Sequence, residues 1–255
     1  MEAILSLMTP AEFVFAAMVA LMGGMIKGMV GFGMPMIMIT GLSTFLLPEL
    51  ALAGLILPTV ASNAMQALRQ GPRQAWASVY RFRVFLMVGF VFLMASAQLV
   101  PQLEPQTFLL VLGVPICVFA GIQLLGVRFQ MHQQTRSADS LFGLMAGLVG
   151  GMSGVWGPPT VLYLTALNTP KTEQVRVQGV IYGLGALALV GAHLGSGVLR
   201  LQTLPLSIGL IAPAVVGMWL GTKVHDRIDQ ATFRKATLII LTVAGLNLVR
   251  RGLMG

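Results

Sequence analysis

A stretch rich in glycine and proline, at residues 147–159, constrains the fold of this chain more than any other feature. It reads GLVGGMSGVWGPP and interrupts an otherwise apolar run. Glycine and proline both disfavour a continuous helix, and a proline also disfavours the helical conformation of the residue before it. We therefore expect a helix to break near residues 155–158.

A second copy of this pattern lies upstream, where residues 24–35 read GMIKGMVGFGMP. Glycines and a proline recur in the two copies at a constant offset of 123 residues: Gly24, Gly28, Gly31 and Pro35 correspond to Gly147, Gly151, Gly154 and Pro158. The chain is therefore predicted to contain two repeats, each with a broken helix.

Composition indicates where these broken helices lie. The 255 residues are 56% hydrophobic and 9% charged, whereas about a quarter of the residues in soluble domains are charged. This composition predicts a polytopic membrane protein. In hydrocarbon, a break exposes backbone N–H and C=O groups that cost several kcal/mol each, so a break persists only when protein buries it or it lines a hydrated cavity. Each break is therefore a candidate site.

The predicted fold class is all-α, with two repeats of about five hydrophobic segments each and the Gly/Pro-broken helices at the centre. Segments 31–47 and 156–167, which follow the breaks, are shorter than the roughly 20 residues that a span needs. Each is either a short tilted span or one arm of a re-entrant hairpin. Apolar segments are placed at about 12–30, 31–47, 50–68, 83–100, 107–126, 140–155, 156–167, 176–197, 204–222 and 235–249.

The distribution of positive charge predicts the topology. Each repeat crosses the membrane an odd number of times, whether the segment after its break is a short span or one arm of a re-entrant hairpin. The second repeat is therefore inverted relative to the first. In this arrangement 12 of the 16 Lys and Arg residues fall in cytoplasmic loops and both termini lie outside. We assign residues 1–127 to the first repeat, 128–139 to a cytoplasmic linker and 140–255 to the second repeat.

The two signature stretches resemble those of a known family. KGMVGFGMP at Lys27–Pro35 and GGMSGVWGPPTVLYL at Gly150–Leu164 are similar to the TauE/SafE family, also called the sulfite exporter or TSUP family. The resemblance implies a permease of the bacterial inner membrane that carries a small sulfur-containing or organic anion, such as sulfite, thiosulfate or a sulfonate. The chain contains neither an HExxH nor a GxSxG motif and no acidic residue within a predicted span, so we expect that it is not an enzyme and that it uses no cofactor.

Lys27 is the first candidate for a substrate-binding residue. A lysine within an apolar segment costs about 3 kcal/mol to insert, so it usually faces a cavity or a partner. We expect Lys27 to bind the anion. The alternative is that Lys27 extends its ammonium to the membrane interface, since it lies near the end of its segment.

Backbone N–H groups at the two breaks are the second kind of candidate. Helix N-termini carry about half a positive charge and bind oxyanions, and glycine permits a close approach. The alternative is that these glycines serve only helix packing. The candidates are Gly31, Phe32 and Gly33 in the first repeat, and Gly154, Val155, Trp156 and Gly157 in the second.

Polar side chains within the spans complete the candidate set. Asn63 and Gln66 share one helix face, as do Gln178 and Tyr182, and each pair either contacts the anion or forms interhelical hydrogen bonds. Arg176 is either a cytoplasmic gate residue or a topology signal. His193 is a candidate for coupling to a proton, because its pKa lies near neutral pH.

The acidic residues are all terminal or lie in predicted loops, which favours an anion over a cation as substrate. We therefore predict a secondary transporter that works by alternating access, with its site at the repeat interface between the two breaks and beside Lys27. A passive anion channel is the alternative. The expected partners are the anion, the lipid bilayer and possibly a coupling proton. Neither a metal nor nucleic acid is expected, and the sequence leaves the oligomeric state open.

Overall fold

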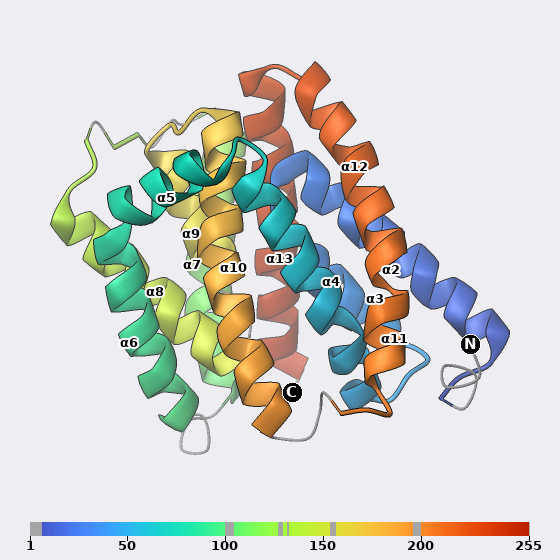
Figure 1. Ribbon diagram of the computed structural model, residues 1–255. Coiled ribbons are helices and arrows are strands. Elements are labelled where there is room, and N and C mark those ends of the chain that lie inside the picture. The colour runs from blue at the N-terminus through green and yellow to red at the C-terminus, as the bar shows by residue number, and fades with distance from the viewer. Residues whose placement is uncertain are drawn as a thin grey trace. The chain divides into compact units, whose positions relative to one another are not determined.

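The computed structural model describes residues 7–99, 105–126, 130–131, 133–153, 157–195 and 200–254. Every regular element in these ranges is a helix (Figure 1). This confirms the all-α class. The helices are α2 (Pro10–Val30), α3 (Met34–Leu42), α4 (Pro48–Leu68), α5 (Pro72–Arg81), α6 (Arg83–Leu99), α7 (Pro105–Leu124), α8 (Arg136–Ser153), α9 (Gly157–Ala166), α10 (Lys171–Gly195), α11 (Leu204–Gly209), α12 (Ile211–Arg227) and α13 (Gln230–Met254).

Several of these helices can cross a membrane. Among the described residues, four segments are long and apolar enough: Pro10–Val30, Leu50–Leu68, Leu204–Arg227 and Gln230–Met254. A fifth is possible if Pro72–Arg81 and Arg83–Ser96, which are bent by 73° relative to each other, form one broken span. These helices identify the chain as a polytopic membrane protein.

The first predicted break has a clear backbone cause. α2 ends at Val30 and α3 begins at Met34, and between them Gly31 and Gly33 have φ angles of 92° and 94°. An L-residue with a side chain rarely adopts such angles, whereas glycine does so without strain. In the second copy, α8 ends at Ser153 and α9 begins at Gly157. Residues 154–156 lie outside the described part of the chain.

The half-helices after the breaks are short and deeply buried. α3 has 9 residues and α9 has 10, so at about 1.5 Å per residue each spans only about half of a 30 Å hydrocarbon core. Met34, Met38 and Leu42 of α3 are fully buried. In α9, every residue from Pro158 to Ala166 is buried. Both half-helices therefore belong to the protein core.

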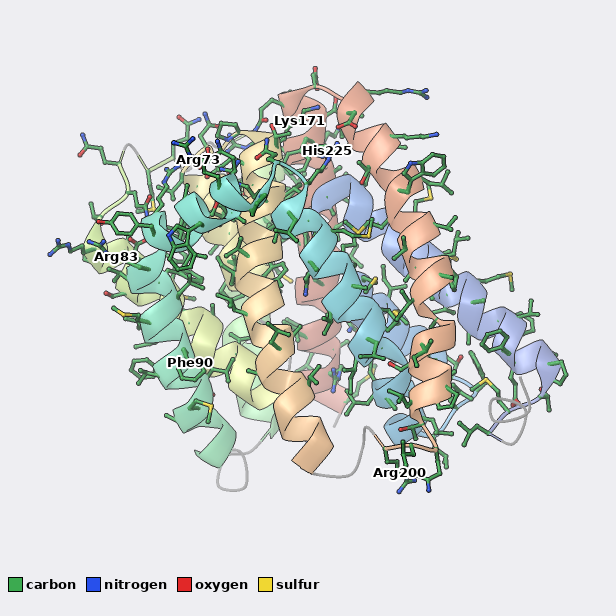
Figure 2. All side chains as sticks on the ribbon, in the orientation of Figure 1. Arg73, Arg83, Phe90, Lys171, Arg200 and His225 are labelled. Carbon is green, nitrogen blue, oxygen red and sulfur yellow. The ribbon has the colours of Figure 1, made fainter. Side chains whose placement is uncertain are left out.

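The structure contains a helix, α5, between the predicted apolar segments 50–68 and 83–100, where the sequence predicted no helix. α5 buries Ser78, while Trp76 and Tyr80 are largely exposed. The guanidinium of Arg83 lies over the Tyr80 ring, with its carbon 4.4 Å from the ring centroid. Arg73 and Arg83 lie at the two ends of α5 (Figure 2). The segment is thus an amphipathic helix with a basic, aromatic surface.

The chain forms two compact units, which do not follow the repeat boundary. The first unit comprises residues 1–72 and 178–228, and the second comprises 73–177 and 229–255. Each unit therefore combines helices from both predicted repeats. In the first unit α2 packs along α12, and in the second α6 packs along α8 and α7 along α13. The broken helix of each repeat thus packs against a helix of the other repeat.

Glycines bring the backbones of α2 and α12 into contact. A Cβ added at Gly24 would lie 2.0 Å from the carbonyl oxygen of Ala214, and one added at Gly28 would lie 2.1 Å from that of Met218. Conversely, a Cβ added at Gly217 or Gly221 would lie 1.9 or 2.0 Å from a carbonyl oxygen of α2. Small residues permit such close approach in membranes, where van der Waals packing drives helix association. We call these four residues the α2–α12 glycine seam.

The second unit has a comparable contact between α6 and α8. A Cβ at Gly147 would lie 2.3 Å from the carbonyl oxygen of Gly89, and one at Gly143 would lie 2.6 Å from that of Phe85. Gly147 is the repeat counterpart of Gly24. Gly24, Gly28, Gly143 and Gly147, which precede the breaks, therefore serve helix packing.

Candidate functional site

Lys27 is buried inside the first unit. It lies in the last turn of α2 and is 1% exposed. It shares the buried side of α2 with Gly24 and Gly28, because Lys27 and Gly28 lie three and four residues after Gly24. Its Nζ donates a hydrogen bond to Oδ1 of Asn63 on α4. The ammonium group therefore does not extend to an aqueous interface.

The charge of Lys27 is not balanced by a nearby carboxylate. In the described part of the chain the ion pairs are Arg69 with Asp226, and Glu173 with Arg81 and Arg176; none involves Lys27. Removing an ammonium group from water costs several kcal/mol unless an opposite charge or hydrogen bonds compensate. In the described part of the chain, the group that compensates this cost is the neutral amide of Asn63, which accepts a hydrogen bond from Lys27.

Side chains from other helices bind the carbonyl groups at the end of α2. Nε2 of Gln66 lies 3.1 Å from the Gly31 oxygen and 3.4 Å from the Lys27 oxygen. The Gln178 amide, oriented so that its nitrogen faces acceptors, donates to the oxygens of Val30 and Gly31 at 3.2 and 3.1 Å. These bonds satisfy carbonyls that the break leaves without intrahelical partners.

Two of the predicted donors are therefore engaged with the protein itself. The amides of Gln66 and Gln178 form interhelical hydrogen bonds, which is one of the two roles considered for them. The N–H of Gly31 also donates within the chain, to the Lys27 oxygen at 2.7 Å. The groups that remain to bind an anion are accordingly fewer than the sequence suggested.

Two buried polar atoms beside Lys27 have no hydrogen-bond partner in the part of the chain that the structure describes: Nδ2 of Asn63 and Oε1 of Gln66. Asn63 is 0% exposed and Gln66 is 1% exposed. A buried N–H without an acceptor costs about 1–3 kcal/mol. An ammonium group has three donors, and one described bond uses one of them. Lys27 and Asn63 thus form a buried pair that is rich in hydrogen-bond donors.

The structure brings eight of the predicted residues into the first unit: Lys27, Gly31, Phe32, Gly33, Asn63, Gln66, Gln178 and Tyr182. Phe32 and Tyr182 are buried. Tyr182 lies one turn after Gln178 on α10, and Gly33 precedes the first residue of α3.

Of the remaining predicted residues, His193 also lies in the first unit, on α10, and the others do not contact the site around Lys27 in the described part of the chain. Gly157 begins α9, and Arg176 lies on α10 in the second unit. Nε of Arg176 donates to Oγ of Ser78 at 2.9 Å, and its Nη2 lies 3.8 Å from Glu173. Gly154, Val155 and Trp156 are outside the described residues, as is the side chain of His193.

His225 contacts the end of α2 next to this site, although the sequence predicted no role for it. It is fully buried, and its Nδ1 lies 3.1 Å from the Met29 carbonyl oxygen. His225 was missed because α12 was expected to end at about residue 222, whereas it continues to Arg227. The signal was a spacing of four residues from Gly217 to Gly221 and on to His225, which places all three on one helix face.

Long apolar helices, together with short buried half-helices, define the class of protein as a polytopic membrane protein. The family model for the sulfite exporter TauE/SafE matches residues 16–248. The chain therefore belongs to the TauE/SafE family of membrane transporters, as its two signature stretches predicted. Comparison with curated proteins gives no match, and comparison with solved structures gives none either.

Proposed function

We propose that this protein is a secondary transporter of a small sulfur-containing or organic anion, such as sulfite, thiosulfate or a sulfonate, across the bacterial cytoplasmic membrane. The observation that carries the proposal is the burial of Lys27 among amide donors without a carboxylate partner in the described part of the chain. Membership of the TauE/SafE family supports the same substrate class.

Electrostatics explains why this arrangement selects an anion. Two opposite unit charges 4 Å apart attract by about 4 kcal/mol at an effective dielectric constant of about 20, against about 1 kcal/mol in water. An anion beside Lys27 would supply the missing counter-charge and accept the N–H of Asn63. A cation at the same place would be repelled by a comparable energy.

The repeat that contains Lys27 is the only one to place a cation at this position, because the residue matching it at an offset of 123 is Gly150. The proposed site is therefore asymmetric and suits a substrate with one anionic head group. In the proposed transport cycle the site lies at the repeat interface and is exposed alternately to the two sides of the membrane. His193 remains the candidate for proton coupling.

Binding to the purified protein tests the proposal. Isothermal titration calorimetry in detergent would measure sulfite, thiosulfate, taurine and acetate against wild type and Lys27→Gln. Lys223→Gln is the matched control, because Lys223 is an exposed lysine of the same unit. We expect Lys27→Gln to weaken anion binding at least tenfold and the control to leave it unchanged. Equal affinity in folded Lys27→Gln would refute the proposed role of Lys27.

Flux into proteoliposomes tests the mechanism. An alternating-access carrier saturates with substrate, because each turnover requires a conformational change. Flux that rises linearly with anion concentration beyond the measured dissociation constant would instead indicate the passive channel. A response of flux to an imposed pH gradient, lost in His193→Ala, would support proton coupling.

A further inference from the structure

The second unit contains a pocket of about 420 Å³ beside the start of α13. Its polar lining comes from three parts of the chain: Gln123 near the end of α7, Asn168 in the α9–α10 connection, and Gln230, Arg234 and Lys235 in the first turns of α13. None of these residues belongs to the candidate site around Lys27, which is built in the first unit.

The charge of the pocket is positive. Two of its lining residues are cations, three are amides, and no carboxylate is among the described lining residues. Asp229 immediately precedes α13, but its Oδ1 accepts the Thr232 N–H at 2.7 Å and so caps the helix. The N-terminal end of α13 adds a partial positive charge to the same region.

One buried donor in this pocket lacks an acceptor. Gln123 is 7% exposed, and its Oε1 accepts a hydrogen bond from Nη2 of Arg234. The Nε2 of the same amide has no hydrogen-bond partner among the described residues. Since an amide nitrogen can only donate, the group that would satisfy it is an acceptor such as an oxyanion.

Hydrogen bonds hold the pocket in shape. The amide of Gln230 accepts the Lys171 N–H at 2.8 Å and donates to the Thr169 oxygen at 3.3 Å, which joins the α9–α10 connection to α13. The bond between Arg234 and Gln123 joins α13 to α7. Hydrogen bonds between α7, the α9–α10 connection and α13 therefore fix the part of the chain that carries the two cations.

We infer that this pocket is a second anion site that binds a phosphate or similar tetrahedral oxyanion through Arg234, Lys235 and Gln123. Arginine and lysine are the usual partners of phosphate, arginine through two parallel hydrogen bonds and lysine as a point charge. A volume of about 420 Å³ also leaves room for the organic part of a phosphate ester. The phosphate could come from a soluble molecule or from an anionic lipid headgroup, which present the same chemistry.

The experiment compares the two sources in the full-length protein. The thermal midpoint is measured in detergent with sodium phosphate or sodium chloride at equal ionic strength, and in nanodiscs of phosphatidylcholine with or without phosphatidylglycerol. Wild type, Arg234→Gln and Gln123→Leu are compared with Arg227→Gln, which removes an exposed arginine outside the pocket. Lys27→Gln tests independence from the site in the first unit.

We expect stabilisation by phosphate or by the anionic lipid in wild type, Arg227→Gln and Lys27→Gln. In Arg234→Gln and Gln123→Leu the concentration giving half of the effect should rise at least tenfold. An effect of free phosphate identifies a soluble anion, and an effect confined to the nanodiscs identifies a lipid headgroup. The inference is overturned if neither source stabilises wild type, or if both pocket variants respond as Arg227→Gln does.

Discussion

Replacing Gly28 by alanine tests the α2–α12 glycine seam. The added Cβ would lie 2.1 Å from the Met218 carbonyl oxygen and 2.9 Å from the Thr222 nitrogen. Because a carbon–oxygen contact needs roughly 3.3 Å, a separation of 2.1 Å requires α2 and α12 to move apart by about 1.2 Å. A gap of 0.5–1 Å already removes about a quarter to a half of the dispersion energy at a contact.

The expected cost follows from this displacement. Overpacking a close-packed interior costs about 1–3 kcal/mol. Alanine favours a helix by about 1 kcal/mol over glycine, but a membrane helix remains helical when its tertiary contacts are lost, so this gain largely cancels. We therefore predict that Gly28→Ala lowers the free energy of unfolding by about 1–3 kcal/mol.

Unfolding in mixed detergent micelles, followed by circular dichroism and by tryptophan fluorescence, would measure this loss. Gly121→Ala is the matched control: Gly121 lies within α7, and an added Cβ there meets no atom within 4 Å. We expect the control to change stability by less than about 0.5 kcal/mol. If Gly28→Ala is as stable as Gly121→Ala, the close contact of α2 with α12 is not present in the protein.

The double variant Gly24→Ala/Gly28→Ala should lose less free energy of unfolding than the sum of the two single variants, by about 0.5 kcal/mol or more. The reason is that one displacement of the helices relieves both contacts. Additive losses would show that the two sites respond separately. Tyr163→Phe removes the 2.7 Å hydrogen bond to Asp139 and should lower the free energy of unfolding by about 1.5–3 kcal/mol. An unchanged midpoint of thermal unfolding would exclude that bond. Gly33→Ala places a side chain at a φ of 94° and should lower the free energy of unfolding by about 1–3 kcal/mol. A variant as stable as wild type would contradict the left-handed backbone at the break.

The sequence predicted the breaks because their causes are local. Gly31 and Gly33 adopt backbone angles that other residues avoid, and the same residue types recur at a fixed offset in the second copy. Lys27 was predicted to face the protein interior because its charge is costly in an apolar segment, and the structure buries it. In both cases the residue type alone carries the physical constraint.

The remaining features depend on tertiary contacts that the sequence does not reveal. Gln66 and Gln178 were recognised as buried donors, but only the fold shows that they bind the carbonyls at the end of α2. α5 was missed because its two arginines and short length suggested a loop, although Trp76 and Tyr80 have the four-residue spacing of one helix face. The packing of α2 against α12 was also not predicted, because the two helices come from different repeats.

That exchange of partners between repeats bears on how the protein is made. α2 ends at residue 30 and α12 begins at residue 211, so synthesis of the intervening chain takes about 10–40 s at about 5–20 residues per second. During this interval α2 is present without the helix that its glycine face contacts. The N-terminal half therefore cannot complete its packing as it is synthesised. Folding of the first unit must wait until most of the C-terminal half has entered the membrane.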